Sequence, residues 1–428
     1  MSEKAASRSG LILSLNAGSS SLKISLYRLT QPDAFGEPVQ LLIDASLSSI
    51  TKDATFSFSA ADESIKAESC KNEPAKDVND HSSGFAYFLD HLKRSAGIER
   101  EKIVHVCHRI VHGGRYQAPV VITEQAYHHI ERLSDLAPLH NGAALSVIHA
   151  CVDALPHANS IAYFDTAFHQ HIPPHIASYA IDQTIAKRKG LRKYGFHGLS
   201  YAYVLRAVSR YLKQDKEDTS IIVLHLGSGA SACAIHHGHS RDTSMGLTPA
   251  SGLPGATRAG VIDPTLIFHY THEAGKITHS KAGMRNVDIT EAEEILNKKS
   301  GWNALAGTTD FAEIVKRRET DEGAQLAFDL FVDRILDFVG AYFLKLGGQV
   351  DVLVFSGGIG ERSVELREAV AQRSECLGFK LDAEKNKGVD DVEGSVVPIG
   401  ERLLVCRTDE QIQMARECAL DIRFWENS

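Results

Sequence analysis

The stretch LILSLNAGSSSLKISLY, residues 11–27, joins an apolar run to a turn of small polar residues. Residues 11–15 are apolar, the turn follows, and a second run with the alternation of a β-strand comes after it. Gly18 lets the backbone turn tightly and approach a ligand closely. Serine hydroxyls and backbone N–H groups supply donors with little bulk, so a turn of this kind suits phosphate oxygens.

The stretch IIVLHLGSGASACAI, residues 221–235, repeats this arrangement in the second half of the chain. An apolar run stops at Gly227, Ser228 and Gly229, and a second run follows. Two phosphate-binding turns, one in each half of a long chain, predict a nucleotide clamped between two related domains. Strands that alternate with helices elsewhere predict an α/β architecture.

Bulk composition sets the broad class. At 428 residues the chain is too long for one ordinary core, so two domains are expected. A net charge of -8 argues against general nucleic-acid binding, which needs a basic footprint. The seven cysteines show no C-x-x-C spacing, which favours free thiols in a reducing cytosol. No signal peptide or membrane-length apolar run is present, so we expect a cytoplasmic protein without membrane contact.

Several segments have a predicted structure but no assigned chemistry. Residues 52–80 are polar and fit an exposed hairpin or a mobile loop. Residues 83–93 carry apolar side chains at helical spacing, and residues 290–293 resemble a capping box. A long apolar stripe over residues 328–346 fits either a core helix or a subunit interface. Residues 351–363 predict a strand, a glycine turn and a helix.

Charged residues at predicted strand ends are candidates for chemistry. Arg109 ends an apolar strand within HRIVHGG, and a guanidinium there can pair bidentately with carboxylate or phosphate. Arg258 sits in a glycine-rich loop with the same capability, although a single arginine is more often a solvated surface charge. Asp165 follows the apolar run 161–164. At that position it could bind a metal-bound water, act as a general base or cap a helix. His140 and His197 could donate to a phosphoryl oxygen or simply be packed.

Taken together and in this order, the motifs strongly resemble the acetate kinase family over nearly the whole chain. They are NAGSSSLK, HRIVHGG, PLHN, FDTAFH, YGFHG, HLGSGAS, GLTP with TRAG, GGIGE and TDE. The resemblance implies the duplicated actin-like ATPase fold, which is ribonuclease H-like, with a nucleotide cleft between two lobes. The lobes are expected to be residues 1–166 plus 409–428 and residues 167–408, with hinges near Thr166 and Thr408. The resemblance also implies a homodimer.

The resemblance assigns roles to residues that match the family's motifs. Asn16, Ser19, Ser21 and Lys23 match the N-terminal phosphate and magnesium turn, and Asn16 with Glu410 is the expected metal site. The expected catalytic residues are Arg109, His140, Asp165, His197 and Arg258. Arg109 with Val111, Leu139, Phe196 and Pro249 is expected to bind acetate. The expected nucleotide-binding residues are Lys23, His225, Gly227, Ser228, Gly229, Asp310, Phe311, Gly357, Gly358 and Gly360.

The implied reaction is the reversible, Mg²⁺- or Mn²⁺-dependent transfer of a phosphoryl group from ATP to acetate, giving ADP and acetyl phosphate. Acetate is already ionised at neutral pH, because its pKa should lie at roughly 4 to 5. The nucleophile therefore needs no general base, unlike the hydroxyl of a sugar. The two arginines would offset the repulsion between the anions, and His197 would donate to the phosphoryl oxygens of a loose transition state.

Departures from the family motifs gather on the nucleotide side. Ser228 stands where the family has asparagine, Ser251 and Ala256 alter the arginine loop, and Ala312 replaces the arginine of a D-x-R segment. Pyrophosphate is therefore an alternative phosphoryl donor. A propionate kinase is a further alternative, because one methylene changes selectivity by only about 1–3 kcal/mol. An actin-like filament or a chaperone would need the phosphate turns but not Arg109, Arg258 and a methyl pocket.

Overall fold

The computed structural model describes residues 8–18, 20–31, 37–133, 138–282 and 285–426, and only the backbone of 138–140, 278–282 and 285–288. The chain divides into two compact units. Unit 1 comprises Met1–Asp165, His279–Val287 and Asp409–Ser428, and unit 2 comprises Thr166–Thr278 and Asp288–Thr408. The segment His279–Val287, which the expected division places in the second lobe, therefore groups with the first.

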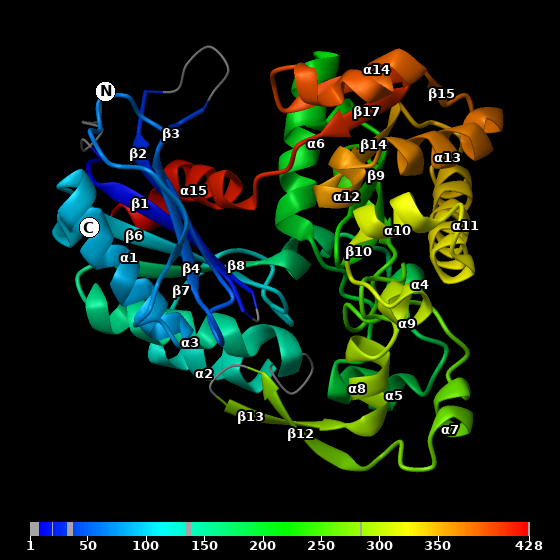
Figure 1. The fold of residues 1–428 in the computed structure, drawn as a ribbon, viewed down its shortest axis with the longest axis horizontal. Coiled ribbons are helices and arrows are strands. Elements are labelled where there is room, and N and C mark those ends of the chain that lie inside the picture. The colour runs from blue at the N-terminus through cyan, green and yellow to red at the C-terminus, as the bar shows by residue number, and fades with distance from the viewer. Residues whose placement is uncertain (1–7, 19, 32–36, 134–137, 283–284, 427–428) are drawn as a thin grey trace. The chain divides into compact units, whose positions relative to one another are not determined.

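Unit 1 is built on an eight-stranded mixed sheet in the order β5-β4-β3-β2-β1-β6-β8-β7 (Figure 1). The first strand, β1, pairs antiparallel with β2 and parallel with β6, which in turn pairs parallel with β8. The strands are β1 (Leu11–Ala17), β2 (Leu22–Leu29), β3 (Val39–Ser48), β4 (Thr55–Ala60), β5 (Cys70–Pro74), β6 (Ile103–Ile110), β7 (Val120–Val121) and β8 (Asn159–Phe164).

Unit 2 is built on a seven-stranded mixed sheet in the order β11-β10-β9-β14-β17-β16-β15. Here β9 pairs antiparallel with β10 and parallel with β14, which pairs parallel with β17. The strands are β9 (Ile221–Leu226), β10 (Ala230–His236), β11 (His239–Thr243), β14 (Val352–Ser356), β15 (Lys380–Leu381), β16 (Val396–Glu401) and β17 (Leu403–Cys406). A separate hairpin consists of β12 (Ile277–Ala282) and β13 (Arg285–Thr290).

The two sheets share one central topology. In sequence order within each unit, the five central strands run 3-2-1-4-5, and the first three are antiparallel while the first, fourth and fifth are parallel. Each predicted phosphate turn joins the first strand of its set to the second. The expectation of a duplicated α/β fold is confirmed.

Helices cover both faces of the unit 1 sheet. Val106 belongs to a core cluster with Phe85, Phe88 and Val147, whereas the neighbouring Cys107 points to the carbonyl of Met414. Because successive residues of a strand face opposite sides, α15 packs on the face opposite α1 and α3. The helices are α1 (His81–Ala96), α2 (Glu124–Leu133), α3 (Pro138–Ala154) and α15 (Glu410–Leu420).

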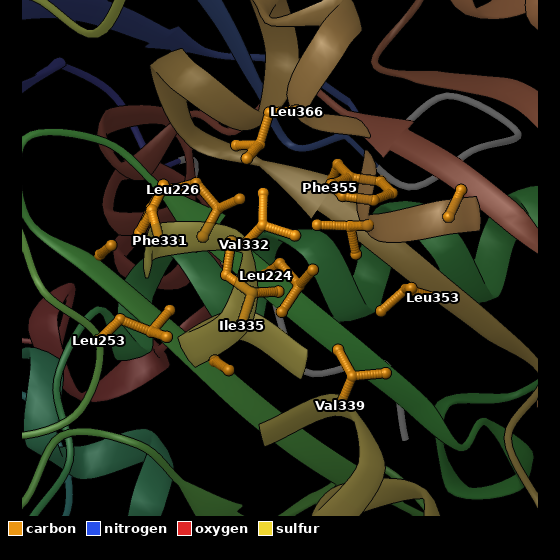
Figure 2. Close-up of a cluster of buried hydrophobic side chains, with 14 of the residues drawn as sticks. Leu224, Leu226, Leu253, Phe331, Val332, Ile335, Val339, Leu353, Phe355 and Leu366 are labelled. Carbon is orange, nitrogen blue, oxygen red and sulfur yellow. The ribbon is translucent and has the colours of Figure 1, made fainter. Parts of the chain in front are cut away.

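The unit 2 sheet is also covered on both faces. Leu224, Leu226 and Phe355 pack against Phe331 and Ile335 of α11, as Figure 2 shows. The alternate residues of the same strands pack against α6 in a second cluster. The helices are α4 (Pro174–Ala177), α5 (Gln183–Lys189), α6 (Gly198–Leu212), α7 (Leu266–Tyr270), α8 (Glu291–Lys298), α9 (Gly301–Ala306), α10 (Phe311–Arg317), α11 (Glu322–Lys345), α12 (Gly357–Arg362), α13 (Val364–Ser374) and α14 (Ala383–Lys387).

The structure decides several local alternatives. Residues 52–80 contain the antiparallel pair β4–β5, so the hairpin interpretation is correct, and Phe56 and Phe58 are buried in the core. The capping box before α8 is present, with Thr290 and Glu293 bonded reciprocally. The apolar stripe of α11 lies in the core of unit 2. Within the described part of the chain, no helix has the length and apolar character needed to cross a membrane.

Candidate active site

Arg109 and Asp165 meet at the ends of two neighbouring parallel strands. Arg109 lies on β6 and pairs in register with Tyr163 of β8, and Asp165 directly follows that strand. Arg109 Nε donates to Asp165 Oδ1 at 3.2 Å, and Nη2 donates to Oδ2 at 2.8 Å. The carboxylate of Asp165 is fully buried. This bidentate pair fixes the plane of the guanidinium.

Asn16 and Glu410 complete this cluster from two other elements of unit 1. Arg109 Nη1 lies 3.2 Å from Asn16 Oδ1 and 3.2 Å from Glu410 Oε2, and Asn16 Nδ2 donates to Glu410 Oε2 at 2.8 Å. Glu410 begins α15, whose N-cap Asp409 accepts hydrogen bonds from Gln411 and Ile412. Burial opposes the charge of Arg109, but the carboxylates outweigh it and raise the pKa of this guanidinium.

The donor set of this cluster fits a hard divalent cation. The side-chain oxygens of Asn16 and Glu410 both lie 3.2 Å from one cationic atom, Arg109 Nη1. Mg²⁺ prefers oxygen ligands and usually keeps several waters with only one or two carboxylates. Among the described residues, no group of three or more His, Cys, Asp or Glu side chains could hold a metal alone. Two protein oxygens plus phosphate and water suit Mg²⁺ better than an all-protein cage.

The structure describes fewer side-chain contacts for the other predicted site residues of unit 1. Lys23 lies on β2 directly opposite Asn16 in the antiparallel register, and its side chain is exposed. Val111 follows β6 and is half-buried. Leu139 and His140 lie in the first turn of α3, and their side chains are outside the described residues, as is all of Ser19. Ser21 closes the turn between β1 and β2, since its carbonyl accepts a hydrogen bond from the backbone N–H of Gly18.

In unit 2, Arg258 lies against the second phosphate turn. A Cβ atom added at Gly229 would come within 3.0 Å of Arg258 Nη1, so only glycine leaves the guanidinium this position. The backbone of Ala256 donates to Ser228 O at 2.8 Å, which attaches the arginine loop to the turn. Burial lowers the pKa of Arg258. The loop thus holds a desolvated cation beside the turn, as an anion site requires.

The rings of His197 and His225 lie against each other in unit 2 with tilted planes. Their ring centroids are 4.2 Å apart and the planes differ by 31°. His197 precedes α6 in a left-handed conformation with φ +58°, which is uncommon for a residue with a side chain. Its Nδ1 lies 2.8 Å from Ser231 Oγ, and His225 Nδ1 lies 2.8 Å from Ser200 Oγ.

The segment that carries Phe196 and His197 is held by buried contacts. His169 of the FDTAFH motif donates through Nε2 to Phe196 O at 2.9 Å, while its Nδ1 contacts Ser240 Oγ at 2.7 Å. Burial lowers the pKa of His169 to about 4, so its ring is neutral at pH 7. Phe196 and Pro249 are both buried. His169 therefore explains part of a motif to which sequence analysis gave no separate role.

A cavity of about 390 Å³ lies wholly within unit 2. It is lined by the predicted residues Gly227, Ser228, Asp310, Phe311 and Gly358. Asp310 caps α10 by accepting from Ala312 N at 2.9 Å, and the Phe311 ring packs into the core against Trp302, Phe328 and Phe331. The lining also includes Thr309, Ala312, Val315, Lys316, Ile359, Arg362, Ser363 and Glu365.

The glycines of SGGIGE differ in what they do. Gly357 has φ +74°, and a Cβ there would lie 2.7 Å from Leu226 O, so the close approach of β14 to β9 requires glycine. Gly360 is buried against β14 and β9. Gly358 lines the cavity and has open space around it.

Sequence analysis missed the hydroxyls behind the histidines and the cations of the cavity. Ser231 is the last residue of the HLGSGAS motif but received no role of its own. Ser200 and Tyr201 lie just after the YGFHG motif, and Tyr201 stands four residues after His197 on one helix. Lys316 stands four residues after Ala312 on α10 and therefore lies on the same helix face. The spacing between Ala312 and Lys316 was therefore the signal in the sequence that the Lys316 cation faces the same cavity as Ala312.

Comparison with known proteins settles the family. A sequence profile described as the acetokinase family matches residues 11–416. The chain belongs to the acetokinase family. A probable acetate kinase of Emericella nidulans is 47% identical over 419 residues, covering 95% of this chain and 97% of the relative. An acetate kinase from Streptomyces coelicolor is 37% identical over 95% of each chain.

Solved structures agree with this assignment. The crystal structure of Porphyromonas gingivalis acetate kinase matches with a TM-score of 0.78 and 33% identity, covering 95% of this chain and 98% of that one. A propionate kinase from Francisella tularensis matches equally well, with a TM-score of 0.79 and 33% identity at the same coverage. Membership of the acetokinase family and the fold are therefore established.

Proposed function

We propose that this chain catalyses the reversible transfer of the γ-phosphoryl group of ATP to acetate. A carboxylate oxygen of acetate attacks the γ-phosphorus, the new bond to phosphorus forms, and the bond to the β,γ-bridging oxygen breaks. ADP leaves with the electron pair, and no proton is transferred. The observation that carries the proposal is the cluster in which Glu410 and the fully buried Asp165 pair with the half-buried guanidinium of Arg109.

The arginines would oppose the repulsion between two anions. Arg109 would hold the acetate carboxylate, and Asp165 would fix the orientation of the guanidinium plane. Arg258 would offset charge on the transferring group, because it lies beside the turn at Gly229 in a desolvated setting. His197 would donate to an equatorial oxygen as charge spreads in a loose transition state.

The carboxylate of Asp165 suits orientation better than proton abstraction. Both of its oxygens accept hydrogen bonds from Arg109. Acetate, with a pKa of roughly 4 to 5, has no proton to lose at pH 7. We therefore assign Asp165 to the positioning of Arg109.

Asn16 and Glu410 would hold Mg²⁺, in part through water, and Mn²⁺ has the same preference for oxygen. When bound, the metal supplies charge neutralisation to the phosphate chain. The chain's own contribution is to present two oxygens from β1 and α15 at one point.

The cavity in unit 2 supports a nucleotide as the phosphoryl donor. Its volume of about 390 Å³ is in the range of small-molecule sites and exceeds what pyrophosphate alone would fill. Val315 and Ile359 offer apolar contact to a base, and Lys316 and Arg362 offer charge to phosphates. Lys316 would supply a cation near the position where Ala312 replaces the family's arginine. We therefore prefer ATP and ADP to pyrophosphate.

Acetate is the proposed acceptor, with propionate as a slower substrate. Val111, Leu139, Phe196 and Pro249 are the proposed methyl pocket, on the resemblance alone. One methylene is worth about 1–3 kcal/mol in such a pocket, so partial activity with propionate is expected.

The direct test is trapping of the acyl phosphate with hydroxylamine. Purified protein is incubated with Mg²⁺ and acetate, and ATP or pyrophosphate is added in separate reactions. We expect acetate-dependent hydroxamate with ATP only, and ATP formation from ADP and acetyl phosphate in the reverse direction. Product with pyrophosphate alone would reject the assigned donor, and absence of hydroxamate with both donors would reject the function.

We also propose a cytoplasmic homodimer. All seven cysteines lie within the described ranges and are free, which suits a reducing compartment. Around α7, Val261, Leu266, Phe268 and Tyr270 expose apolar side chains, and Phe268 is 65% exposed. An apolar group of this kind favours contact with another protein surface, and a second copy would bury it symmetrically.

A further inference from the structure

Three side chains of unit 2 form a connected chain of hydrogen bonds that ends at His197. Tyr201, one turn along α6 from His197, is fully buried, and its hydroxyl pairs with Ser231 Oγ. Ser231, at the start of β10, is also fully buried, and the same oxygen lies 2.8 Å from His197 Nδ1. A single serine hydroxyl therefore contacts both the phenol and the imidazole.

The chemistry of these groups favours one direction for the chain. A serine oxygen has one proton to donate and can accept two hydrogen bonds. A phenol is the more acidic hydroxyl, so Tyr201 is the better donor and Ser231 the better acceptor of that pair. In this direction Ser231 donates its own O–H hydrogen bond to His197 Nδ1. Because the bond at one ring nitrogen decides the tautomer, this direction places the proton of a neutral imidazole on Nε2.

We propose that Ser231 and Tyr201 are positioning residues that hold His197 in the tautomer with its proton on Nε2. This rests on the proposed function, in which His197 donates to a phosphoryl oxygen. A neutral imidazole can donate from one nitrogen only, so the opposite tautomer would turn Nε2 into an acceptor facing an anion. The relay would thus prepare the donor before substrate arrives.

The surroundings of His197 indicate that the hydrogen bonds from Tyr201 and Ser231 do more than satisfy buried groups. The side chain of His197 makes no capping hydrogen bond to α6, and its backbone is left-handed. The contacts of the ring are therefore what orients it. The neighbouring His225 is held in the same manner, with Ser200 Oγ between its Nδ1 and Thr408 Oγ1 at 2.8 Å from each. Two adjacent rings, each bonded at Nδ1 to a fully buried serine hydroxyl, point to control of the tautomer.

The test is ¹⁵N NMR of the histidine rings in the substrate-free protein. The His197 signals are assigned by their loss in His197→Gln. In the wild type at neutral pH we expect the pattern of a neutral ring protonated at Nε2. In Tyr201→Phe we expect the signals to move toward a mixture of both tautomers. A ring protonated at Nδ1 in the wild type, or unchanged His197 signals in Tyr201→Phe, would overturn the proposal.

Kinetics separate positioning from a general structural effect. Tyr201→Phe should lower kcat about tenfold, the equivalent of one hydrogen bond, while KM for ATP and acetate changes less than twofold. Ser231→Ala should lower kcat more, roughly a hundredfold, and give the same tautomer mixture.

The matched control is Tyr342→Phe, a fully buried tyrosine of the same unit whose hydroxyl has no hydrogen-bond partner among the described residues. It should keep both the His197 signals and kcat, and an equal loss in this variant would overturn the proposal. If the protein formed no acetyl phosphate at all, the proposed function would fail, whereas the NMR result on the free protein would still decide the tautomer.

Discussion

Arg109 and Asp165 are joined by two parallel hydrogen bonds, of 3.2 and 2.8 Å, at adjacent ends of β6 and β8. The two residues are 56 positions apart in the chain and meet because their strands are parallel neighbours in register. The pairing orients a half-buried guanidinium toward the oxygens of Asn16 and Glu410. The first two predictions concern this pair.

Replacement of Arg109 by alanine should lower kcat/KM for acetate by roughly a hundredfold or more, as loss of a transition-state donor does elsewhere. Arg109→Lys should recover little, because an ammonium cannot pair bidentately with Asp165. Initial rates over an acetate series measure both. Arg28→Ala is the control, since Arg28 is a half-exposed arginine of the same sheet that pairs with Asp62. Normal turnover in Arg109→Ala would remove this arginine from the mechanism.

Asp165→Asn keeps the shape of the side chain but removes the charge facing Arg109. We expect kcat to fall about tenfold to a hundredfold, with the shape of the pH–rate profile unchanged, because orientation is lost and no base is removed. The melting temperature should also fall, since the half-buried guanidinium loses its charged partner. Complete loss of activity at every Mg²⁺ concentration in a folded variant would instead indicate a required proton acceptor.

Lys316→Ala tests the cavity of unit 2. Loss of this cation should raise KM for ATP about fivefold, the effect of roughly 1 kcal/mol, and leave KM for acetate unchanged. Lys387→Ala is a suitable comparison, because Lys387 is an exposed helical lysine paired with Glu384. A rise in KM for acetate with constant KM for ATP would exclude the cavity as the nucleotide site.

Stability toward acid should depend on His105. Both nitrogens of this buried ring lack a hydrogen-bond partner within the described part of the chain, and the ring packs edge-on against Trp425. Burial lowers its pKa from 6.5 to about 4. Between these values the unfolded chain binds a proton that the folded chain does not, so the stabilisation is complete above pH 6.5 and is lost as pH falls toward 4.

His105→Phe should therefore flatten the fall of the melting temperature between pH 6.5 and 4.5. One proton contributes at most about 1.4 kcal/mol per pH unit to the slope. Some slope should persist, because burial also lowers the pKa of His108 to about 3 and of His169 to about 4. His149→Phe, at an exposed position, should leave the slope as in the wild type. An unchanged slope in His105→Phe would contradict the assignment.

Phe268→Asp tests the proposed dimer. A charge in the exposed apolar group around α7 should shift the protein toward monomer in sedimentation at micromolar concentration. Leu344→Asp is the comparison, since Leu344 is a highly exposed leucine of α11 in the same unit. A dimer that survives Phe268→Asp and dissociates with Leu344→Asp would move the interface to α11.

Local sequence determined a large part of the fold. Alternating apolar residues around the small-residue turns predicted β1–β2 and β9–β10, and the TEAE segment predicted the cap of α8. These features depend on neighbours within a few residues, so backbone propensity and periodicity decide them. The apolar stripe of α11 was ambiguous, because a core face and an interface bury the same residue types.

Among the candidate residues, the sequence by itself predicted Arg109 and Asp165 from their places at the ends of apolar strands and from family motifs, and Glu410 from its family motif alone. Only the tertiary structure decided that the three converge, since residues far apart meet through strand order and register. It alone also brought Tyr201 and Ser231 behind His197 and Lys316 to the cavity. Hydrogen bonds act over about 3 Å, and a linear pattern carries no information about which distant hydroxyl will lie within that reach.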